Sequence, residues 1–458
     1  MNRAETIELI YLFSAVCFIV ALKGLSSPRS ARAGNLIGAA GMVVAVGATF
    51  ATPGLHRIGL IVVALVLGTA VGVPAARSVK MTAIPQMVAA FNGVGGGAAA
   101  LVSLAEFDRG HASFGTAAAV LFSTLIGAVS FTGSAITFLK LQELMTGRPV
   151  VLPRQREINV ALAVAALAFV GWGLSDRSVT AAVLLTLVAG VMGVLFVLPV
   201  GGADVPVVIS LLNSFTGLAV AATGAVLRMT LLIVAGTLVG ASGTLLTRMM
   251  SQAMGRPLSS TLFGALTATA SAGAVAEEGG DRSVRTDTVD DVAVLLAYAN
   301  RVVVVPGYGL AVAQAQHTIR ELADLLESRG VEVVYGIHPV AGRMPGHMNV
   351  LLAEANVPYE QLREMDDVNP QFPLTDVVLV VGANDVVNPA ARDSPGSPIY
   401  GMPILNVDEA RAVVFLKRSM RPGFAGIDNA LLYDPKTTML FGDAKETLTA
   451  LVSAVKTA

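Results

Sequence analysis

Nine long apolar segments, separated by short polar loops, fill the first 250 residues of the chain. They run over roughly residues 6–25, 34–51, 57–76, 84–105, 115–139, 158–174, 179–200, 205–226 and 230–249. A helix needs about 20 mostly apolar residues to cross a bilayer, and these segments are close to that length. The pattern therefore predicts a membrane α-helical bundle of about nine transmembrane helices in residues 1–250.

The hydrophobic pattern changes after residue 250. Residues 251–290 lose the long apolar runs, and the charged stretch 276–285 is typical of a linker between domains. In residues 291–458, strands are expected near 301–305, 331–335, 376–381, 403–407, 412–416 and 438–441, and helices near 309–328, 347–356, 408–412 and 443–455. This alternation predicts an α/β domain with a Rossmann-like, doubly wound parallel sheet.

Composition supports this division into a membrane half and a soluble half. The chain is 54% hydrophobic, with a mean hydropathy of +0.69, which is too apolar for a soluble protein. Residues 1–250 carry 15 Lys and Arg against 8 Asp and Glu, whereas residues 251–458 carry 16 against 24. Neither half is basic enough to indicate nucleic acid as a partner, and the single cysteine, Cys17, excludes a disulfide framework within the chain.

Loop charges predict the orientation of the bundle, because Lys and Arg are enriched on the cytoplasmic side. With nine spans, 5 basic residues fall on one side: Arg3, Arg57, Arg109, Arg177 and Arg228. The other side has 11: Lys23, Arg29, Arg32, Arg77, Lys80, Lys140, Arg148, Arg154, Arg156, Arg248 and Arg256. The N-terminus is therefore expected outside, and the C-terminal domain in the cytoplasm.

Polar side chains inside the spans are candidates for a polar path, because they are costly in a membrane. Asn92 and Asn213 are the strongest candidates, and Ser242 is a third. The alternative is helix packing, in which hydroxyls bond their own helix carbonyls. No Asp, Glu, Lys, Arg or His lies near the middle of any span, so a proton path would have no carrier of these types.

A glycine turn follows the most apolar strand of the second half. Val302 to Val305 are typical of a buried strand, and Gly307, Gly309 and Val312 occupy the small positions of a G-x-G-x-x-G pattern, with Val in place of the last glycine. Strand, tight turn and helix would aim backbone N–H groups at a pyrophosphate. The alternative is an ordinary glycine turn of an α/β domain.

Other loops should meet this turn at the carboxyl edge of the sheet, where open α/β folds bind ligands. They are residues 336–347, 382–389, 417–426 and 442–445. A site for NAD places Asp or Glu at the end of the second strand, but here that strand ends in Tyr335 and Gly336. Lys417, Arg418 and Ser419 could instead bind a phosphate, which favours NADP over NAD. The alternative is a solvated charge pair at a strand end.

Long motifs in both halves carry a resemblance to a known family. They are Ser210–Gly217, Leu232–Gly243, Gly307–His317, Gly336–Ala355, Gly382–Pro389, Lys417–Met420 and Met439–Lys445. Over essentially its whole length the chain resembles the beta subunits of the proton-translocating NAD(P) transhydrogenases. The resemblance implies that the soluble domain binds NADP(H) in a reversed orientation and requires no metal.

The resemblance also implies roles for particular residues. One stretch would run alongside the cofactor's phosphates, namely Gly307, Tyr308, Gly309, Leu310, Ala311 and Val312. The 2′-phosphate would be held by Lys417, Arg418 and Ser419. The nicotinamide end would be lined by Arg343, Met344, Asn384 and Asp385. Gly382 and Ala383, which precede Asn384, would also contact the cofactor. Two lids would be formed by Gly423, Phe424, Ala425 and Gly426, and by Gly442, Asp443 and Ala444.

In such an enzyme an alpha subunit carries the NAD(H)-binding domain, and hydride passes directly between the two nicotinamides. The chain would act only with that partner, as a Re/Si-specific enzyme of the bacterial inner membrane, in a hetero-oligomer with two copies of each subunit. Asp385 and His338 are candidates for coupling cofactor binding to protonation. Alternatively, Asp385 bonds a carboxamide or loop amide, and His338 caps the turn before Pro339.

Two residues depart from the family pattern. Phe424 stands where the family often has Tyr, and Asn92 stands where some members have His, so the proton route is open. A different class of protein, a channel or transporter gated by a nucleotide-sensing domain, has the same architecture. It would need neither the phosphate-binding group 417–419 nor the long motif 336–355. A soluble dehydrogenase with a membrane anchor would need only one span.

Overall fold

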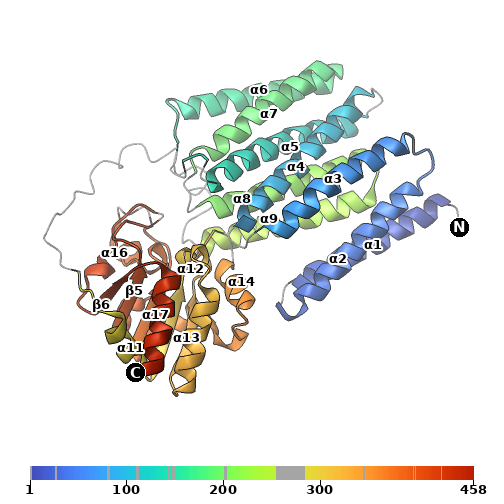
Figure 1. Ribbon diagram of the computed structural model, residues 1–458. Coiled ribbons are helices and arrows are strands. Elements are labelled where there is room, and N and C mark those ends of the chain that lie inside the picture. Colours follow the sequence, from blue (N-terminus) through green and yellow to red (C-terminus); the bar gives the residue numbers. More distant parts are fainter. Residues whose placement is uncertain are drawn as a thin grey trace. The chain divides into compact units, whose positions relative to one another are not determined.

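The computed structural model describes residues 3–25, 28–79, 83–109, 113–142, 144–146, 150–200, 204–253, 284–343, 346–395, 397, 399–423 and 425–458. The chain divides into two compact units, one made mostly of the long N-terminal helices and the other mostly of residues 248–458. Figure 1 shows helices alone in the first and a sheet with helices in the second. Each unit is described separately.

Nine helices in the described part of the chain are long and apolar enough to cross a membrane, which confirms the prediction of a multi-pass membrane protein. They are α1 (Arg3–Leu25), α2 (Pro28–Phe50), α3 (Ile58–Ser78), α4 (Ile84–Asp108), α5 (Phe114–Leu141), α6 (Gln155–Asp176), α7 (Val179–Val197), α8 (Val205–Val226) and α9 (Thr230–Ala253). Their ends differ from the expected segments by a few residues, because polar loop residues extend several helices.

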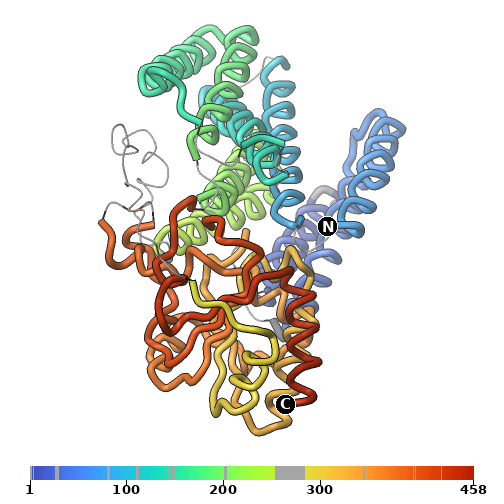
Figure 2. Tube along the Cα trace, turned by 60° about the vertical axis from the view of Figure 1, so that its left-hand side comes forward, coloured from blue at the N-terminus to red at the C-terminus, as the bar shows by residue number. Residues whose placement is uncertain are grey.

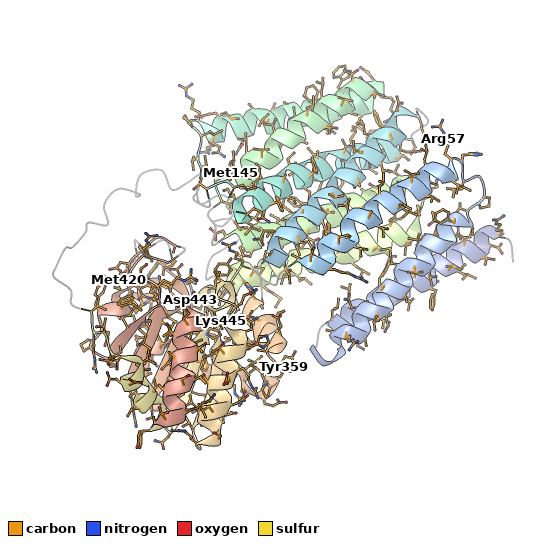
Figure 3. All side chains as sticks on the ribbon, viewed as in Figure 1. Arg57, Met145, Tyr359, Met420, Asp443 and Lys445 are labelled. Carbon is orange, nitrogen blue, oxygen red and sulfur yellow. The ribbon has the colours of Figure 1, made fainter. Side chains whose placement is uncertain are left out.

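Small residues bring these helices together. A Cβ atom added to Gly217 of α8 would lie 2.5 Å from the backbone nitrogen of Gly240 of α9, and one added to Gly236 would lie 2.4 Å from that of Ala221. Such close backbone approach is how membrane helices pack without a hydrophobic driving force between them. Outward-facing side chains of the bundle are largely apolar, as a lipid environment requires (Figure 3).

The second unit contains a six-stranded parallel sheet in the order β3-β2-β1-β4-β5-β6. The strands are β1 (Arg301–Pro306), β2 (Glu332–Ile337), β3 (Leu362–Glu364), β4 (Val377–Val381), β5 (Ala412–Lys417) and β6 (Thr437–Phe441). The fold is therefore Rossmann-like and doubly wound, as the sequence predicts. Reversal of the strand order at β1 and β4 opens a crevice at their carboxyl ends.

Helices cover both faces of the sheet. The α-helices are α11 (Val289–Ala297), α12 (Tyr308–Val312), α13 (Gln316–Ser328), α14 (His347–Glu354), α15 (Met365–Val368), α16 (Ala390–Asp393) and α17 (Ala444–Thr457). The 3-10 helices are η3 (Tyr359–Gln361), η4 (Asn369–Leu374), η5 (Asp385–Val387), η6 (Val407–Glu409) and η7 (Ala430–Tyr433). One face is covered by α11, α13, α14 and α17, and the other by α15, η4, η6 and η7.

Strand β1 shows why the sheet is buried on both sides. Val302 and Val304 belong to the core under α13 and α17, whereas Val303 and Val305 belong to the core on the opposite face. Successive side chains of a strand point to opposite faces, so an unbroken run of valines serves two cores at once.

Three predictions about the elements of this unit were wrong, and other elements were missed. Residues 403–407 form no strand, because the Leu405 amide donates to the carbonyl of Val386, and the Ile404 carbonyl accepts from Asn369. The predicted helix 408–412 is replaced by η6 and the start of β5. The short strand β3 and the helix α11 were not expected. The predicted helix 309–328 is divided into α12 and α13 near Gln314, whose φ is +50°.

The described end of the expected linker lies against the sheet; its residues 254–283 are outside the part that the structure describes. Thr286 forms a parallel bridge to Met439 of β6, whose amide donates to the carbonyl of Arg285. Helix α11 follows and runs beside α17 (Figures 1 and 2). Residues 284–290 therefore pack with the α/β unit.

Candidate nucleotide-binding site

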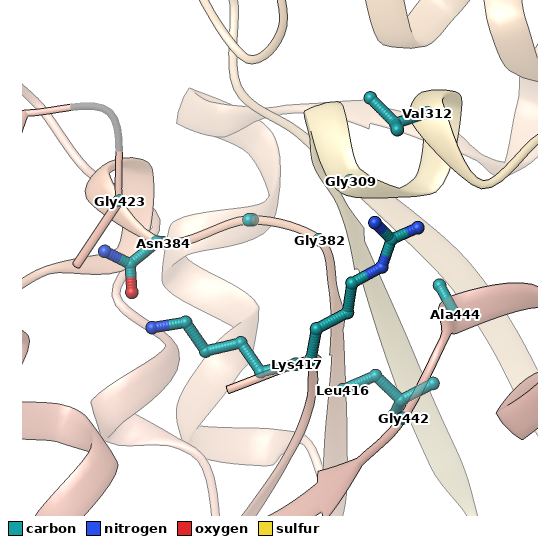
Figure 4. A pocket seen from close by; sticks show the side chains of 11 residues that line it. Gly309, Val312, Gly382, Asn384, Leu416, Lys417, Gly423, Gly442 and Ala444 are labelled. Carbon is teal, nitrogen blue, oxygen red and sulfur yellow. The ribbon is translucent and has the colours of Figure 1, made fainter. Parts of the chain in front are cut away.

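A cleft of about 250 Å³ lies at the carboxyl ends of β1, β4, β5 and β6 (Figure 4). Its lining is Gly309, Val312, Gly382, Ala383, Asn384, Leu416, Lys417, Arg418, Gly423, Gly442 and Ala444. The structure therefore brings the glycine turn together with three of the four loops that were expected to meet it at this edge; the 336–347 loop does not line the cleft. Leu416 is the one lining residue that sequence reasoning missed, although it directly precedes Lys417.

The glycine turn after β1 is packed against the turn after β4. A Cβ atom added to Gly309 would lie 2.6 Å from the Cα of Gly382, which itself has a φ of +70°. The Gly309 amide donates to the Gly382 carbonyl at 2.9 Å, and the Gly307 amide donates to that of Val381. The amide of Gly309 is thus occupied by the protein, so close contact between the two turns explains these glycines.

Two cations stand at the end of β5. Lys417 donates from Nζ to the carbonyl of Arg421 at 2.9 Å, and its amino end is turned toward Asn384 in Figure 4. Burial lowers the pKa of Lys417, while the carboxylates of Asp385 and Asp428 oppose that change. A half-buried ammonium in a cleft is stabilised by any anion that binds beside it.

Arg418 is paired with an acid that follows the neighbouring strand, β6. Its guanidinium lies 2.6 Å from Asp443, which caps α17 by accepting from the Lys445 amide (Figure 3). The hydrogen bond from Arg418 is the main reason that the pKa of Asp443 lies below its usual range. Ser419, the third residue of the expected phosphate group, accepts from the Arg421 amide at 3.4 Å.

Asn384 and Asp385 join the cleft to the loop that follows β5. Asp385 accepts from Asn384 through Oδ1 at 3.1 Å and from the Ala425 amide through Oδ2 at 2.8 Å. A Cβ atom on Gly423 would lie 2.4 Å from Asp385 Oδ1. The buried Oδ1 of Asn384 has no hydrogen-bond partner among the described residues. A buried acceptor of this kind fits a ligand that carries an N–H or O–H group.

The ring of His338 is buried away from solvent, at 2% exposure. Its Nδ1 accepts from the Val340 amide at 3.2 Å, and its Nε2 donates to the Pro403 carbonyl at 2.8 Å. Burial lowers the pKa of His338 to about 4. A neutral ring with both nitrogens bonded to backbone groups favours the alternative in which His338 fixes the turn before Pro339.

The remaining predicted cofactor contacts lie outside the cleft lining. Leu310 and Ala311 are buried in the core, so only their backbone could meet a ligand. Tyr308 and Arg343 stack on each other, with the guanidinium carbon 4.4 Å from the ring centre. The other residues that do not line it are Gly307, Asp385, Ser419, Ala425, Gly426 and Asp443. Met344 and Phe424 lie outside the described residues.

In the helical unit, Asn92 belongs to a buried polar network between α4, α5 and α8. Its Nδ2 donates to Ser134 at 2.9 Å and to Ser130 at 3.3 Å. The Ser130 hydroxyl lies 2.6 Å from that of Thr216 and donates to the carbonyl of Leu212. Asn92 Oδ1 is buried without a partner among the described residues.

The two other predicted path residues do not join this network. Asn213 is half-buried, and Ser242 is exposed and donates to the Val239 carbonyl of its own helix. A second cluster was missed, in which the Ser123 hydroxyl lies 2.7 Å from that of Thr223, and Thr223 lies 3.0 Å from Ser103. It lies on the same three helices, and only the packing of these helices reveals it.

Lys140 was counted among the loop charges, but the structure buries it at the end of α5. Its Nζ donates to the carbonyls of Val197, Leu198 and Val200 at 2.6–3.0 Å. The ammonium therefore caps the C-terminal end of α7, where the helix dipole favours a cation.

Comparison with known proteins agrees with this architecture. The family model described as NAD(P) transhydrogenase beta subunit matches residues 7–454. Two sequences named NAD(P) transhydrogenase subunit beta, from Rhodospirillum rubrum and from its strain ATCC 11170, are each 46% identical over 454 residues. The alignments cover 97% of this chain and 98% of each relative. The chain therefore belongs to the NAD(P) transhydrogenase beta subunit family.

Proposed function

We propose that this chain binds NADP(H) in the cleft, receives or gives a hydride at that cofactor, and couples the exchange to proton translocation across the membrane. The other nicotinamide nucleotide, NAD(H), would be bound by a partner alpha subunit. The observation that carries this proposal is the pair of cations at the end of β5, Lys417 and Arg418, facing a glycine-lined cleft.

The choice of NADP(H) over NAD(H) rests on the sheet. Strand β2 ends at Ile337 and is followed by His338, so it has no acid at its end to bond a ribose 2′-hydroxyl. Lys417 and Arg418 can instead bind a 2′-phosphate by charge-assisted hydrogen bonds. Asp443 holds Arg418 beside the cleft, so the guanidinium would be shared between this acid and the phosphate.

The position of these cations supports a reversed cofactor. In common dinucleotide sites the adenosine ribose lies at the end of β2, on one side of β1. Here the cations lie on β5, on the opposite side of β1. A 2′-phosphate held there would place the adenosine over β5 and β6, and the rest of the dinucleotide would extend toward Asn384 and the turn at Gly309.

The residues present fit such a cofactor. The unpartnered Oδ1 of Asn384 can accept from a carboxamide N–H, and the glycines at 309, 382, 423 and 442 present backbone along the cleft. The bound nicotinamide supplies the hydride chemistry, so no side chain needs to act as acid or base on the hydride. The protein positions the cofactor, and residues 423–426 would exclude water from it.

Asp385 is the proposed link between the cofactor and protonation. Both of its carboxylate oxygens accept hydrogen bonds, one of them from the Ala425 amide in the loop 423–426. Protonation of either oxygen places a hydrogen beside a donor and weakens that bond. Because reduction removes the positive charge of the nicotinamide, Asp385 would bind a proton more readily beside NADPH, and the loop would loosen.

The membrane part of the proposal rests on the network around Asn92. Asn92, Ser130 and Thr216 can relay hydrogen bonds, with water as the proton carrier. The predicted orientation, with the N-terminus outside and the C-terminal domain in the cytoplasm of a bacterium, follows from the loop charges. We also propose a hetero-oligomer with two copies of each subunit, and a soluble domain that includes residues 284–290.

The test is an assay of hydride exchange with the purified chain in proteoliposomes, with and without its co-isolated partner. The pair should transfer hydride from NADH to NADP⁺ or an NADP⁺ analogue, and an uncoupler should change the rate when the vesicles hold a proton gradient. The chain alone should not catalyse the exchange, because its sequence contains one dinucleotide fingerprint. Robust exchange by the isolated chain, or nucleotide-gated ion flux without exchange, would overturn the proposal.

A further inference from the structure

A histidine that is not among the predicted cofactor contacts lies behind the glycine turn. His347 begins α14 and is fully buried. Its Nδ1 accepts a hydrogen bond from the Arg343 amide at 3.1 Å. Its ring lies 6.0 Å from that of Tyr308, centre to centre, at an interplanar angle of 54°. The Arg343 guanidinium in turn stacks on the Tyr308 ring, with its carbon 4.4 Å from the ring centre.

These contacts form a closed triangle of Tyr308, Arg343 and His347, which we call the clamp. Gly342 precedes Arg343 with a φ of +105°, and a Cβ atom on it would lie 2.4 Å from His347 Nδ1. The turn that carries Arg343 is therefore shaped to approach the imidazole closely. Because Tyr308 stands between Gly307 and Gly309, a displaced clamp would displace the glycine turn that lines the cleft.

The imidazole serves the clamp in its neutral form. An Nδ1 that accepts a hydrogen bond leaves the ring proton on Nε2. Burial, with Arg343 as a second cause, lowers the pKa of His347 to about 4. At neutral pH the ring is thus a fixed acceptor.

We propose that His347 is a positioning residue, whose Nδ1 holds Arg343 and whose ring packs against Tyr308, so that the Gly307–Gly309 turn is set for the non-adenosine half of NADP(H). The inference rests on the proposed function. The glycine turn lies at the β1 end of the cleft, whereas Lys417 and Arg418 lie at the β5 end. A defect in the clamp should therefore affect one half of the cofactor and spare the other.

This separation makes the inference testable with two ligands. NADP⁺ reports on the whole cleft, and adenosine 2′-monophosphate reports on the β5 and β6 end alone. Both would be titrated calorimetrically into the full-length chain in nanodiscs. His347→Phe keeps a ring and removes the acceptor, while His347→Asn keeps an acceptor near the position of Nδ1 and removes the ring. His317→Asn, at an exposed position of α13, is the matched control.

His347→Phe should weaken NADP⁺ binding about 3- to 10-fold, the factor expected for one neutral hydrogen bond, and should leave adenosine 2′-monophosphate binding within twofold of wild type. His347→Asn should recover most of the NADP⁺ affinity, and His317→Asn should change nothing. If the Phe variant does not fold, Gly342→Ala tests the same hydrogen bond and should give the same divergence between the two ligands.

Unchanged NADP⁺ affinity in His347→Phe and Gly342→Ala, or an equal loss for both ligands, would overturn the inference. Equal loss would mean that the buried ring stabilises the domain in general. A wild-type chain that binds neither ligand would overturn the proposed function itself, and this inference with it. The wild-type titration therefore separates the two failures.

Discussion

The interior of the helical unit and the cleft of the α/β unit differ in the kind of polar group that they contain. Around Asn92 the polar groups are amides and hydroxyls, and no Asp, Glu, Lys, Arg or His lies near the middle of a span. Around Asn384 the cleft is bordered by charged groups, namely Lys417, Arg418 and Asp385. Under the proposed function, a change of charge would therefore start in the cleft and be passed on through uncharged groups in the bundle.

The experiment with the largest expected effect removes the titratable group from the cleft and so tests the difference between the two regions. Asp385→Asn keeps the shape and one of the two accepted hydrogen bonds but cannot bind a proton. We expect proton translocation to fall roughly 100-fold or more, the scale of losing a positioned proton carrier. The variant should also lose the pH dependence of NADP⁺ against NADPH affinity. Proton uptake by proteoliposomes and calorimetry at several pH values measure these effects.

The control for Asp385→Asn is Asp408→Asn, an acid of η6 that pairs with Arg392 on the surface. It should pump like wild type. If Asp385→Asn retained both pumping and the pH dependence, the coupling role of the cleft acid would have to be abandoned.

A second experiment asks whether the cations of the cleft select the cofactor. Lys417→Ala removes a charge-assisted bond worth roughly 1.5–3 kcal/mol, so NADP⁺ affinity should fall about 10- to 150-fold. NAD⁺ affinity, already weak, should hardly change, because it has no 2′-phosphate. Lys436→Ala is the matched control, since Lys436 lies just before β6, at the opposite end of the strands, and bonds the Asp408 carbonyl. Equal losses for both cofactors would refute the phosphate assignment.

A third experiment tests the buried polar network around Asn92 in the bundle. Asn92→Ala removes two hydrogen bonds to serine hydroxyls and should slow proton translocation about 30-fold, at roughly 1 kcal/mol per bond. NADP⁺ affinity of the purified chain should stay unchanged. Ser242→Ala is the control, because that side chain is exposed and bonds its own helix. Equal effects of the two substitutions would remove Asn92 from the route.

The spans and the central strands could be predicted because each is specified by its own residues. Nine apolar segments are long enough to span, and Val302 to Val305 are apolar on both faces of a strand. The strand predicted at residues 403–407 was wrong because Ile404 and Leu405 are apolar and buried, as strand residues are. Their backbone groups nevertheless bond Asn369 and Val386 instead of a neighbouring strand. Burial alone does not distinguish these cases.

The candidate site could be predicted only in part for the same reason. The glycines and cations follow strands directly, so their place at the sheet edge was foreseeable. The pairing of Arg418 with Asp443, the contact between Gly309 and Gly382, and the clamp around His347 join residues distant in sequence. No local pattern encodes such contacts, so they required the fold.

The contact between residues 284–287 and β6 has a practical consequence. Thr286 and Arg285 occupy the outer edge of this strand, and the Thr438 hydroxyl donates to Asp287. A soluble fragment that began at residue 291 would expose that row of N–H and C=O groups, and exposed edges pair with other chains. Such a fragment should associate with itself and aggregate as its concentration rises, whereas one that includes residue 284 keeps its own edge covered.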